Sequence, residues 1–259
     1  MKYNKSLIIL SLLIWTLLPI GAQDAGTTQG DFKVSQSGAA TYTVPIGIPP
    51  GVGGTAPGIS LQYSSQGGNG LAGWGWNIGG HSSIIRVGAS KWYDGFIDQV
   101  DFDDKDKFAM DGQRLILKSG VYGKNGSVYE TTLHSNIKII AYGTCPLGPQ
   151  AGPQKFIAYH PDGSNATYEV KLTDPNNPHP RHANEWVITR FEDAAKNRIY
   201  FYYYGSQPYE RVRLKSIIYG GNGFQSGGAM NKIEFIWKSR QRPESSYSAG
   251  YDLFHRKHI

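Results

Sequence analysis

The sequence predicts an all-β protein made of antiparallel sheets, with essentially no helix after residues 1–22. Three observations support this prediction. The chain contains 33 glycines and 13% aromatic residues, a composition that favours strands and turns. Short runs such as residues 59–63 alternate between apolar and polar side chains, as half-buried strands do. Asn-Gly and Asp-Gly pairs separate these runs. We expect the sheets to pack as a sandwich.

The expected strands are rich in Val, Ile, Thr, Tyr, Phe and Trp, the residues that suit a pleated sheet. In order along the chain they are residues 41–46, 59–63, 82–87, 113–117, 137–142, 156–160, 167–172, 186–191, 199–204, 211–219 and 232–237. Outside residues 1–22, no stretch of about ten residues has helical periodicity.

Six dipeptides mark expected turns, because glycine after Asn or Asp supplies a positive φ at low steric cost. They are Asn69-Gly70, Asp94-Gly95, Asp111-Gly112, Asn125-Gly126, Asp162-Gly163 and Asn222-Gly223. Asp111-Gly112 is the strongest hairpin candidate, since the runs Phe-Ala-Met before it and Gln-Arg-Leu-Ile-Leu after it have the pattern of paired strands.

Residues 47–81 are rich in glycine and proline, which excludes a helix. Trp74, Trp76 and Tyr63 interrupt this segment, and aromatic residues at that density indicate an ordered unit of loops and strands rather than a disordered linker. A second proline-rich loop, at residues 175–184, marks a candidate lobe boundary.

The N-terminus has the layout of a secretory signal. Lys2 and Lys5 precede an apolar run at residues 6–20, and Ala22 supplies a small residue before Gln23. We expect cleavage between Ala22 and Gln23, which leaves a secreted or extracytoplasmic domain at residues 23–259. An uncleaved anchor is the alternative. The run falls short of the roughly 20 residues that a spanning helix needs, so no stable membrane span is expected.

Positive charge gathers toward the C-terminus. From Lys196 onward, eleven Lys and Arg residues stand against four acids. These charges are scattered through strand-like sequence, which favours solvated strand faces over a surface for an acidic protein, anionic lipid or nucleic acid. We expect no nucleic-acid partner. Cys145 is the single cysteine, so no internal disulfide forms, and a nucleophilic role would need a histidine that the sequence does not place.

Metal and cofactor patterns fail at named residues. The acidic run Asp101, Asp103, Asp104 and Asp106 invites calcium, but Lys105 or Phe108 occupies the fifth position of an EF-hand register, which favours a solvated loop of alternating charges. His179 and His182 flank Pro180, which forbids the helix such a metal pair uses. Residues 51–56 match a dinucleotide fingerprint only superficially, because prolines on both sides exclude a strand–turn–helix.

Five consecutive aromatic residues, at positions 200–204, form one further candidate site. Alternation puts Tyr200, Tyr202 and Tyr204 on one face of a strand, and Phe201 and Tyr203 on the other. Aromatic residues on both faces favour a strand buried between layers, and a glycan-binding platform is the alternative. We therefore expect no catalytic residue, no cofactor and no bound metal.

Residues 30–87 carry the most distinctive pattern. An entry strand at Ser37-Gly38-Ala39-Ala-Thr-Tyr42 is followed by Pro49-Pro50-Gly51, by Leu-Gln-Tyr63-Ser-Ser and by Gly-Asn-Gly70-Leu-Ala-Gly73-Trp-Gly75-Trp76. This order resembles the N-terminal region of the Salmonella virulence plasmid B protein (SpvB) family. It also resembles the start of the B components of insecticidal toxin complexes (TcaC/TcdB-like, Rhs-type shell proteins). Residues 101–117, which include Asp111-Gly112, and residues 186–203 resemble later parts of the same family.

The resemblance implies a structural and assembly module of a secreted bacterial toxin or virulence protein. It also implies that the sheets form part of a shell wall, as the alternative to a sandwich. In the toxin complexes, B and C components build a β-rich shell around a cytotoxic cargo. The implied partners are a downstream shell region or toxin-complex subunits, and the implied chain is truncated relative to the full-length family. SpvB itself carries ADP-ribosyltransferase activity in a separate C-terminal domain. That activity needs a Glu-x-Glu pair, which is absent from the sequence. The alternative function is a secreted surface module that recognises a glycan or a host protein.

Overall fold

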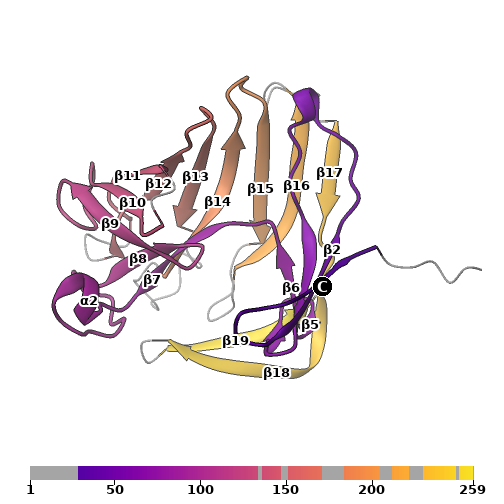
Figure 1. Cartoon of the computed structure of the whole chain (residues 1–259), viewed down its shortest axis with the longest axis horizontal. Coiled ribbons are helices and arrows are strands. Elements are labelled where there is room, and N and C mark those ends of the chain that lie inside the picture. The colour runs from indigo at the N-terminus through magenta and orange to yellow at the C-terminus, as the bar shows by residue number, and fades with distance from the viewer. Residues whose placement is uncertain are drawn as a thin grey trace, which may run out of the picture.

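A computed structural model describes residues 29–133, 136–146, 151–170, 184–204, 212–221, 230–248 and 251–258. Within these ranges nearly every element is a strand, and the strands form three antiparallel sheets (Figure 1). The predicted all-β class is confirmed. Several predicted features lie outside the described residues, namely Ala22 and Gln23, most of the expected boundary at 175–184, His179, His182 and Asn222-Gly223.

The largest sheet has eleven strands in the order β13-β12-β11-β10-β9-β8-β7-β14-β15-β16-β17. Their bounds are β7 Ser83–Val87, β8 Lys107–Met110, β9 Gln113–Ser119, β10 Val128–Thr131, β11 Lys138–Tyr142, β12 Lys155–Tyr159, β13 Asn165–Val170, β14 Glu185–Glu192, β15 Arg198–Tyr204, β16 Arg213–Gly221 and β17 Asn231–Glu234. Because β13 also pairs with β14, strands β7 to β14 close into a barrel-like ring.

Strand β14 joins the ring to the rest of the sheet. Its first residues, Glu185 to Val187, pair with β7, whereas its last residues, Arg190 to Glu192, pair with β15. One edge of β14 therefore serves two neighbours in succession. Strands β15, β16 and β17 leave the ring along this edge and continue as an open extension (Figure 1).

Large aromatic side chains fill the ring. Trp186, Phe156 and Phe108 contact one another edge to face, with ring centroids 5.2 to 5.3 Å apart. Each is at most 2% exposed, and Trp186 Nε1 donates a hydrogen bond to the carbonyl of Pro153. A ring of about eight strands is just wide enough for side chains to fill it. Burial of each such side chain contributes about 1.5–3 kcal/mol to folding.

The second sheet has six strands in the order β1-β2-β3-β6-β5-β4. Its strands are β1 Asp31–Val34, β2 Ala40–Pro45, β3 Ser60–Ser64, β4 Asn69–Gly70, β5 Gly73–Trp74 and β6 Trp76–Gly79, with the 3-10 turn η1 at Val52–Gly54. The segment that follows β2 contacts the large sheet, because the carbonyls of Pro49 and Pro50 accept hydrogen bonds from β16 and β17. Buried Ile59 and Ile78 belong to the same apolar cluster as Trp186, so the two sheets share one core.

Two smaller elements complete the described fold. Strands β18 (Lys238–Ser248) and β19 (Tyr251–His258) form a separate two-stranded sheet. The short helix α2 (Lys91–Asp94) lies between β7 and β8. Among the described residues, no helix has the length and apolar character that crossing a membrane requires.

All of the predicted strands coincide with observed ones, with ends that differ by no more than three residues. Strands β1 and β10 and the hairpin of β18 and β19 were not predicted. The ordered unit predicted for residues 47–81 is also present, as strands β3 to β6 and the turn η1.

The predicted turns have three different outcomes. Asp111 and Gly112 both have positive φ, 48° and 80°, and connect β8 to β9 as predicted. The turn predicted at Asn69-Gly70 is wrong, because these residues form β4 and Gly70 pairs with Gly73. Gly95 adopts the left-handed conformation after Asp94, but it ends helix α2 instead of closing a hairpin.

Candidate functional site

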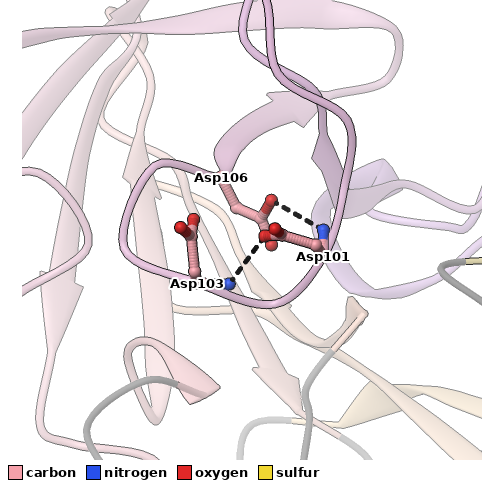
Figure 2. Close-up of side chains that lie close together, drawn as sticks. All are labelled: Asp101, Asp103 and Asp106. Carbon is pink, nitrogen blue, oxygen red and sulfur yellow. Dashed lines mark hydrogen bonds between the residues drawn. The ribbon is translucent and has the colours of Figure 1, made fainter.

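Three carboxylates converge in the loop that precedes β8. Single oxygens of Asp101, Asp103 and Asp106 lie within 4.8 Å of one another, and Figure 2 shows the three side chains gathered inside this loop. The amide of Asp101 donates a hydrogen bond to Asp106 Oδ1, and the amide of Asp103 donates one to Asp101 Oδ1 (Figure 2). The loop therefore closes on its own acidic side chains.

Asp106 forms a buried ion pair with Arg86 of β7. Arg86 Nη1 donates to Asp106 Oδ2 at 2.9 Å, and the two side chains are only 2% and 1% exposed. The Arg86 guanidinium lies 5.7 to 5.9 Å from the ring centroids of Phe102, Phe108 and Trp186. A buried charge needs a partner, and aromatic faces also stabilise a guanidinium. The pair thus anchors the acidic loop to the aromatic core of the ring.

The strained backbone at Phe102 also helps to hold Asp106 in place. Phe102 has a φ of 67°, a conformation that costs a bulky residue about 1–2 kcal/mol. It lets the Phe102 amide donate to Asp106 Oδ2 at 2.8 Å. Burial raises the pKa of Asp106, while hydrogen bonds from the loop amides and Arg86 act in the opposite direction. Burial likewise lowers the pKa of Arg86.

A cation would find only part of a site here. Asp106 Oδ2 already accepts hydrogen bonds from Arg86 and Phe102, and Oδ1 accepts one from Asp101. Calcium takes about six to eight oxygen ligands, more than the unengaged oxygens of three carboxylates supply. The arrangement is therefore suited to holding the loop in place. The solvated loop predicted for this run is wrong at Asp106, because this side chain is buried against Arg86. Nothing in the sequence indicates that Arg86 lies beneath it.

The entry strand of the family motif is held by a polar turn. Gly38 has a φ of 81°, and the hydroxyl of Ser37 donates to Gln66 Oε1. Ala39 is 3% exposed. Tyr42 pairs with Phe32 on β1 and with Tyr63 on β3. These residues therefore set the turn into β2 and its register.

Pro49, Pro50 and Gly51 attach the small sheet to the large one. The hydroxyl of Tyr219 on β16 donates to the Pro49 carbonyl at 2.8 Å, and Asn231 Nδ2 donates to the Pro50 carbonyl at 3.4 Å. A Cβ on Gly51 would lie 1.9 Å from the carbonyl oxygen of Thr55, so only glycine fits there. The segment that resembled a dinucleotide fingerprint is thus a 3-10 turn tied to β16 and β17.

The glycines of the second motif allow close packing around two aromatic rings. Tyr63 and Trp76 have ring centroids 5.3 Å apart. Gly75 has a φ of 75°, and a Cβ there would lie 2.6 Å from the Tyr63 ring. A Cβ on Gly70 would lie 2.1 Å from the carbonyl oxygen of Trp76, and Gly73 has a φ of 118°. These contacts are architectural.

The hairpin residue Asp111 also stabilises the start of β7. Its carboxylate accepts hydrogen bonds from the Ser83 amide at 3.0 Å and from the Ser82 hydroxyl at 2.6 Å. The Ser82 hydroxyl in turn contacts the hydroxyl of Tyr168 at 2.9 Å.

The single cysteine, Cys145, is buried in a loop. Its amide donates a hydrogen bond to the carbonyl of Gly152, and the residue is 2% exposed.

The burial predicted for both faces of residues 200–204 is wrong on one face. Phe201 is buried in the shared core, and Tyr203 on the same face is half-buried, packs against that core and donates a hydrogen bond to the Ile188 carbonyl at 2.8 Å. Tyr200, Tyr202 and Tyr204 lie on the other face and are only half-buried. The guanidinium of Arg213 lies 5.4 Å from the centroid of the Tyr204 ring, and Lys215 Nζ lies 5.7 Å from it. The strand therefore has one core face and one outer face.

The family model described as "Salmonella virulence plasmid 65kDa B protein" matches residues 34–143. No curated protein matches the sequence. The matched residues include all the motif residues named above from the entry strand to Asp111-Gly112. The resemblance to the SpvB family is therefore confirmed.

Solved structures extend the likeness in fold to most of the chain. The crystal structure of TcdB2-TccC3 matches 89% of this chain with a TM-score of 0.66 and 16% identity. The Photorhabdus luminescens Tc holotoxin pore matches with a TM-score of 0.63 and 17% identity over 89% of this chain and 13% of its own. The N-terminal domain of the effector SpvB from Salmonella typhimurium strain LT2 matches with a TM-score of 0.56 and 18% identity, over 79% of this chain and 81% of its own.

The chain is short beside the toxin-complex structures. It spans 14% of the TcdB2-TccC3 chain that it matches. Its fold thus occurs there as one part of a much longer polypeptide, whereas in SpvB it corresponds to an N-terminal domain.

Proposed function

We propose that this chain is a non-catalytic structural and assembly module of a secreted bacterial toxin-complex or virulence protein, and that it contributes wall to a shell that houses or delivers a toxic cargo. The observation that carries the proposal is the likeness in fold to TcdB2-TccC3 over 89% of the chain. The family match at residues 34–143 adds to it.

The packing inside the ring favours a structural wall over a ligand-binding cavity. Trp186, Phe156 and Phe108 fill the interior of the ring together with the ion pair of Arg86 and Asp106. A ring filled in this way is rigid. Its sheet continues through β15 to β17, which extends the wall beyond the ring.

The proposed lack of catalysis rests on where the family's activity lies. The matched structure of SpvB is its N-terminal domain, and the sequence contains no Glu-x-Glu pair. We expect the purified chain to leave actin unmodified in the presence of NAD. Transfer of radiolabelled ADP-ribose to actin would contradict this part of the proposal.

Export and processing complete the proposal. Residues 1–22 would direct secretion, with cleavage between Ala22 and Gln23, and residues 23–259 would form the module. N-terminal sequencing of the chain recovered from culture supernatant tests the cleavage, and a chain that begins at Met1 would contradict it.

The size of the secreted particle tests the assembly role. The chain alone has a mass of 28.5 kDa. As part of a shell, it should elute from size-exclusion chromatography of native culture supernatant in a particle many times larger, with cross-links to toxin-complex subunits or to a downstream shell region. Elution of all the secreted chain as a monomer would contradict the assembly role.

The half-buried face of Tyr200, Tyr202 and Tyr204 favours one alternative, a secreted module that recognises a glycan or host protein. A monomeric chain that is retained on a glycan array, and that loses retention in a Tyr200→Ala/Tyr202→Ala variant, would support this alternative over the shell module.

A further inference from the structure

Four large apolar side chains lie exposed in and directly after helix α2. Trp92, Ile97, Tyr93 and Phe96 are 87%, 77%, 52% and 40% exposed. We call these four residues the aromatic tip. Single exposed apolar side chains are ordinary on a protein surface, but a contiguous group of this kind marks a contact with a protein or a membrane.

The segment that carries the aromatic tip is rigidly held. Both carboxylate oxygens of Asp94 accept hydrogen bonds from Arg114 Nη2, at 2.6 and 2.7 Å, and Arg114 Nη1 donates to the carbonyl of Gly88. The Asp94 and Arg114 side chains are only 10% and 11% exposed. An isolated bridge between Ala89 and Asp98 closes the segment. The four side chains are thus displayed by a structure that is already ordered, which lowers the entropy cost of binding.

The charges around the aromatic tip leave no strong net field. Asp98 pairs with Lys105 at 3.5 Å, and Asp104 pairs with Lys124 at 2.7 Å. Exposed Lys91 lies in α2 itself, and Lys107 Nζ lies 5.6 Å from the centroid of the Phe96 ring. Asp94, Asp98 and Asp104 are therefore each paired with a cationic side chain, so a surface without net charge suits the tip better than a strongly basic partner.

The area of the tip separates a lipid surface from a protein interface. A large apolar side chain offers about 150–250 Å² when fully exposed, so the four residues, at their exposed fractions, offer on the order of 400–650 Å². A stable protein interface needs about 800 Å² from each partner, more than the tip provides. Reversible attachment to lipid headgroups has no such minimum, because its strength scales with whatever apolar area is buried. Figure 1 also shows α2 and β17 toward opposite ends of the molecule.

We propose that the aromatic tip binds the interfacial region of a zwitterionic phospholipid bilayer, such as a phosphatidylcholine membrane. Trp and Tyr favour the headgroup level, because each ring is apolar and carries one polar group. Phe96 and Ile97 lie deeper, and Lys91 and Lys107 contact headgroup phosphates. The attachment is peripheral and reversible, since binding strength scales with the apolar area that is buried.

Co-sedimentation of the full chain with phosphatidylcholine vesicles tests the proposal. We expect wild type to partition onto the vesicles and the variant Trp92→Ser/Ile97→Ser to partition about tenfold less. The matched control is Phe32→Ser/Val34→Ser on β1, which removes two side chains that are 63% and 65% exposed at another site. Vesicles that also contain phosphatidylserine should capture wild type about equally well.

Quenching of tryptophan fluorescence by brominated phosphatidylcholine locates the contact without disturbing binding. Trp92→Phe retains an apolar ring, so this variant should still bind but lose most of the quenching. Trp74→Phe replaces a tryptophan that is 71% exposed elsewhere, on β5, and should keep the quenching of wild type.

Three results would overturn the proposal. The first is no partition of wild type onto phosphatidylcholine vesicles. The second is an equal loss of binding in both double variants. The third is concentration-dependent self-association that Trp92→Ser/Ile97→Ser abolishes while vesicles capture nothing, because the tip would then be a protein contact. None of these results bears on particle size in culture supernatant, which tests the shell function separately.

Discussion

The closed ring and the small N-terminal sheet are both antiparallel β-structure, yet different interactions determine them. The ring is held by apolar side chains that interlock in its interior, as Trp186 and Phe156 do. In the small sheet, β1 is exposed along its whole length, and Trp74 on β5 is 71% exposed. Its shape depends on glycines with unusual φ angles or no room for a Cβ, such as Gly75 and Gly70. The ring is thus specified by burial, and the small sheet by backbone conformation.

The largest effect should come from the ring core. Trp186→Ala removes a side chain with no exposed surface and leaves the Pro153 carbonyl without its donor. We expect a loss of about 3–5 kcal/mol in the free energy of unfolding, from lost burial and from the cavity. Urea denaturation followed by circular dichroism measures it. The control Trp74→Ala should change stability by less than about 0.5 kcal/mol. Equal losses in both variants would contradict the contrast between the two regions.

The buried ion pair should give the next largest effect. Asp106→Ala leaves Arg86 charged in the aromatic core and also frees the amides of Asp101 and Phe102. We expect a loss of about 3 kcal/mol in the free energy of unfolding. The double variant Asp106→Leu/Arg86→Met should recover a large part of that loss, because neither buried charge remains. A double variant less stable than Asp106→Ala would show that the pair itself is stabilising.

The small sheet should respond instead to glycine substitution. Gly75→Ala combines a positive φ with a Cβ 2.6 Å from Tyr63, and should cost about 2–3 kcal/mol. Gly38→Ala has a positive φ but open space, and should cost about 1 kcal/mol. Gly47→Ala has open space and no positive φ, and should be within about 0.5 kcal/mol of wild type. Thermal unfolding ranks the stability of the three variants. Equal stability in all three would contradict the conclusion that backbone conformation specifies the small sheet.

The smallest effect should come from alkaline titration of the buried tyrosines of the ring. Burial raises the pKa of Tyr168 from 10.0 to about 12, and it also raises the pKa of Tyr129. A raised pKa means that the folded state favours the neutral phenol. The resulting stabilisation is complete below pH 10 and is lost as the pH rises through about 12. Tyrosinate absorbance should therefore show a late-titrating class that shrinks in Tyr168→Phe. Ionisation of all tyrosines near their ordinary pKa would contradict the burial.

The strands of the ring could be predicted from the sequence because they are rich in the β-branched and aromatic residues that suit a pleated sheet. Residues 156–160 and 186–191 were placed correctly for this reason. Strand β1 was missed although its four residues alternate between polar and apolar side chains, because the run is short and all four residues are exposed, so the pattern marks no buried face. Asn69-Gly70 was misread as a turn, because the same dipeptide fits the crowded strand β4, where the Trp76 carbonyl leaves no room for a side chain.

The all-β class and the positions of most strands follow from the sequence, because residue type, local periodicity and turn chemistry are sufficient for them. The family enters separately, through the resemblance of its motif. The pairing of β13 with β14 that closes the ring, the place of Arg86 under Asp106 and the exposure of the aromatic tip are visible only in the folded structure. The first two depend on contacts between residues far apart in the chain, and the third depends on the absence of neighbouring atoms over the tip. None of these three features leaves a local pattern in the sequence.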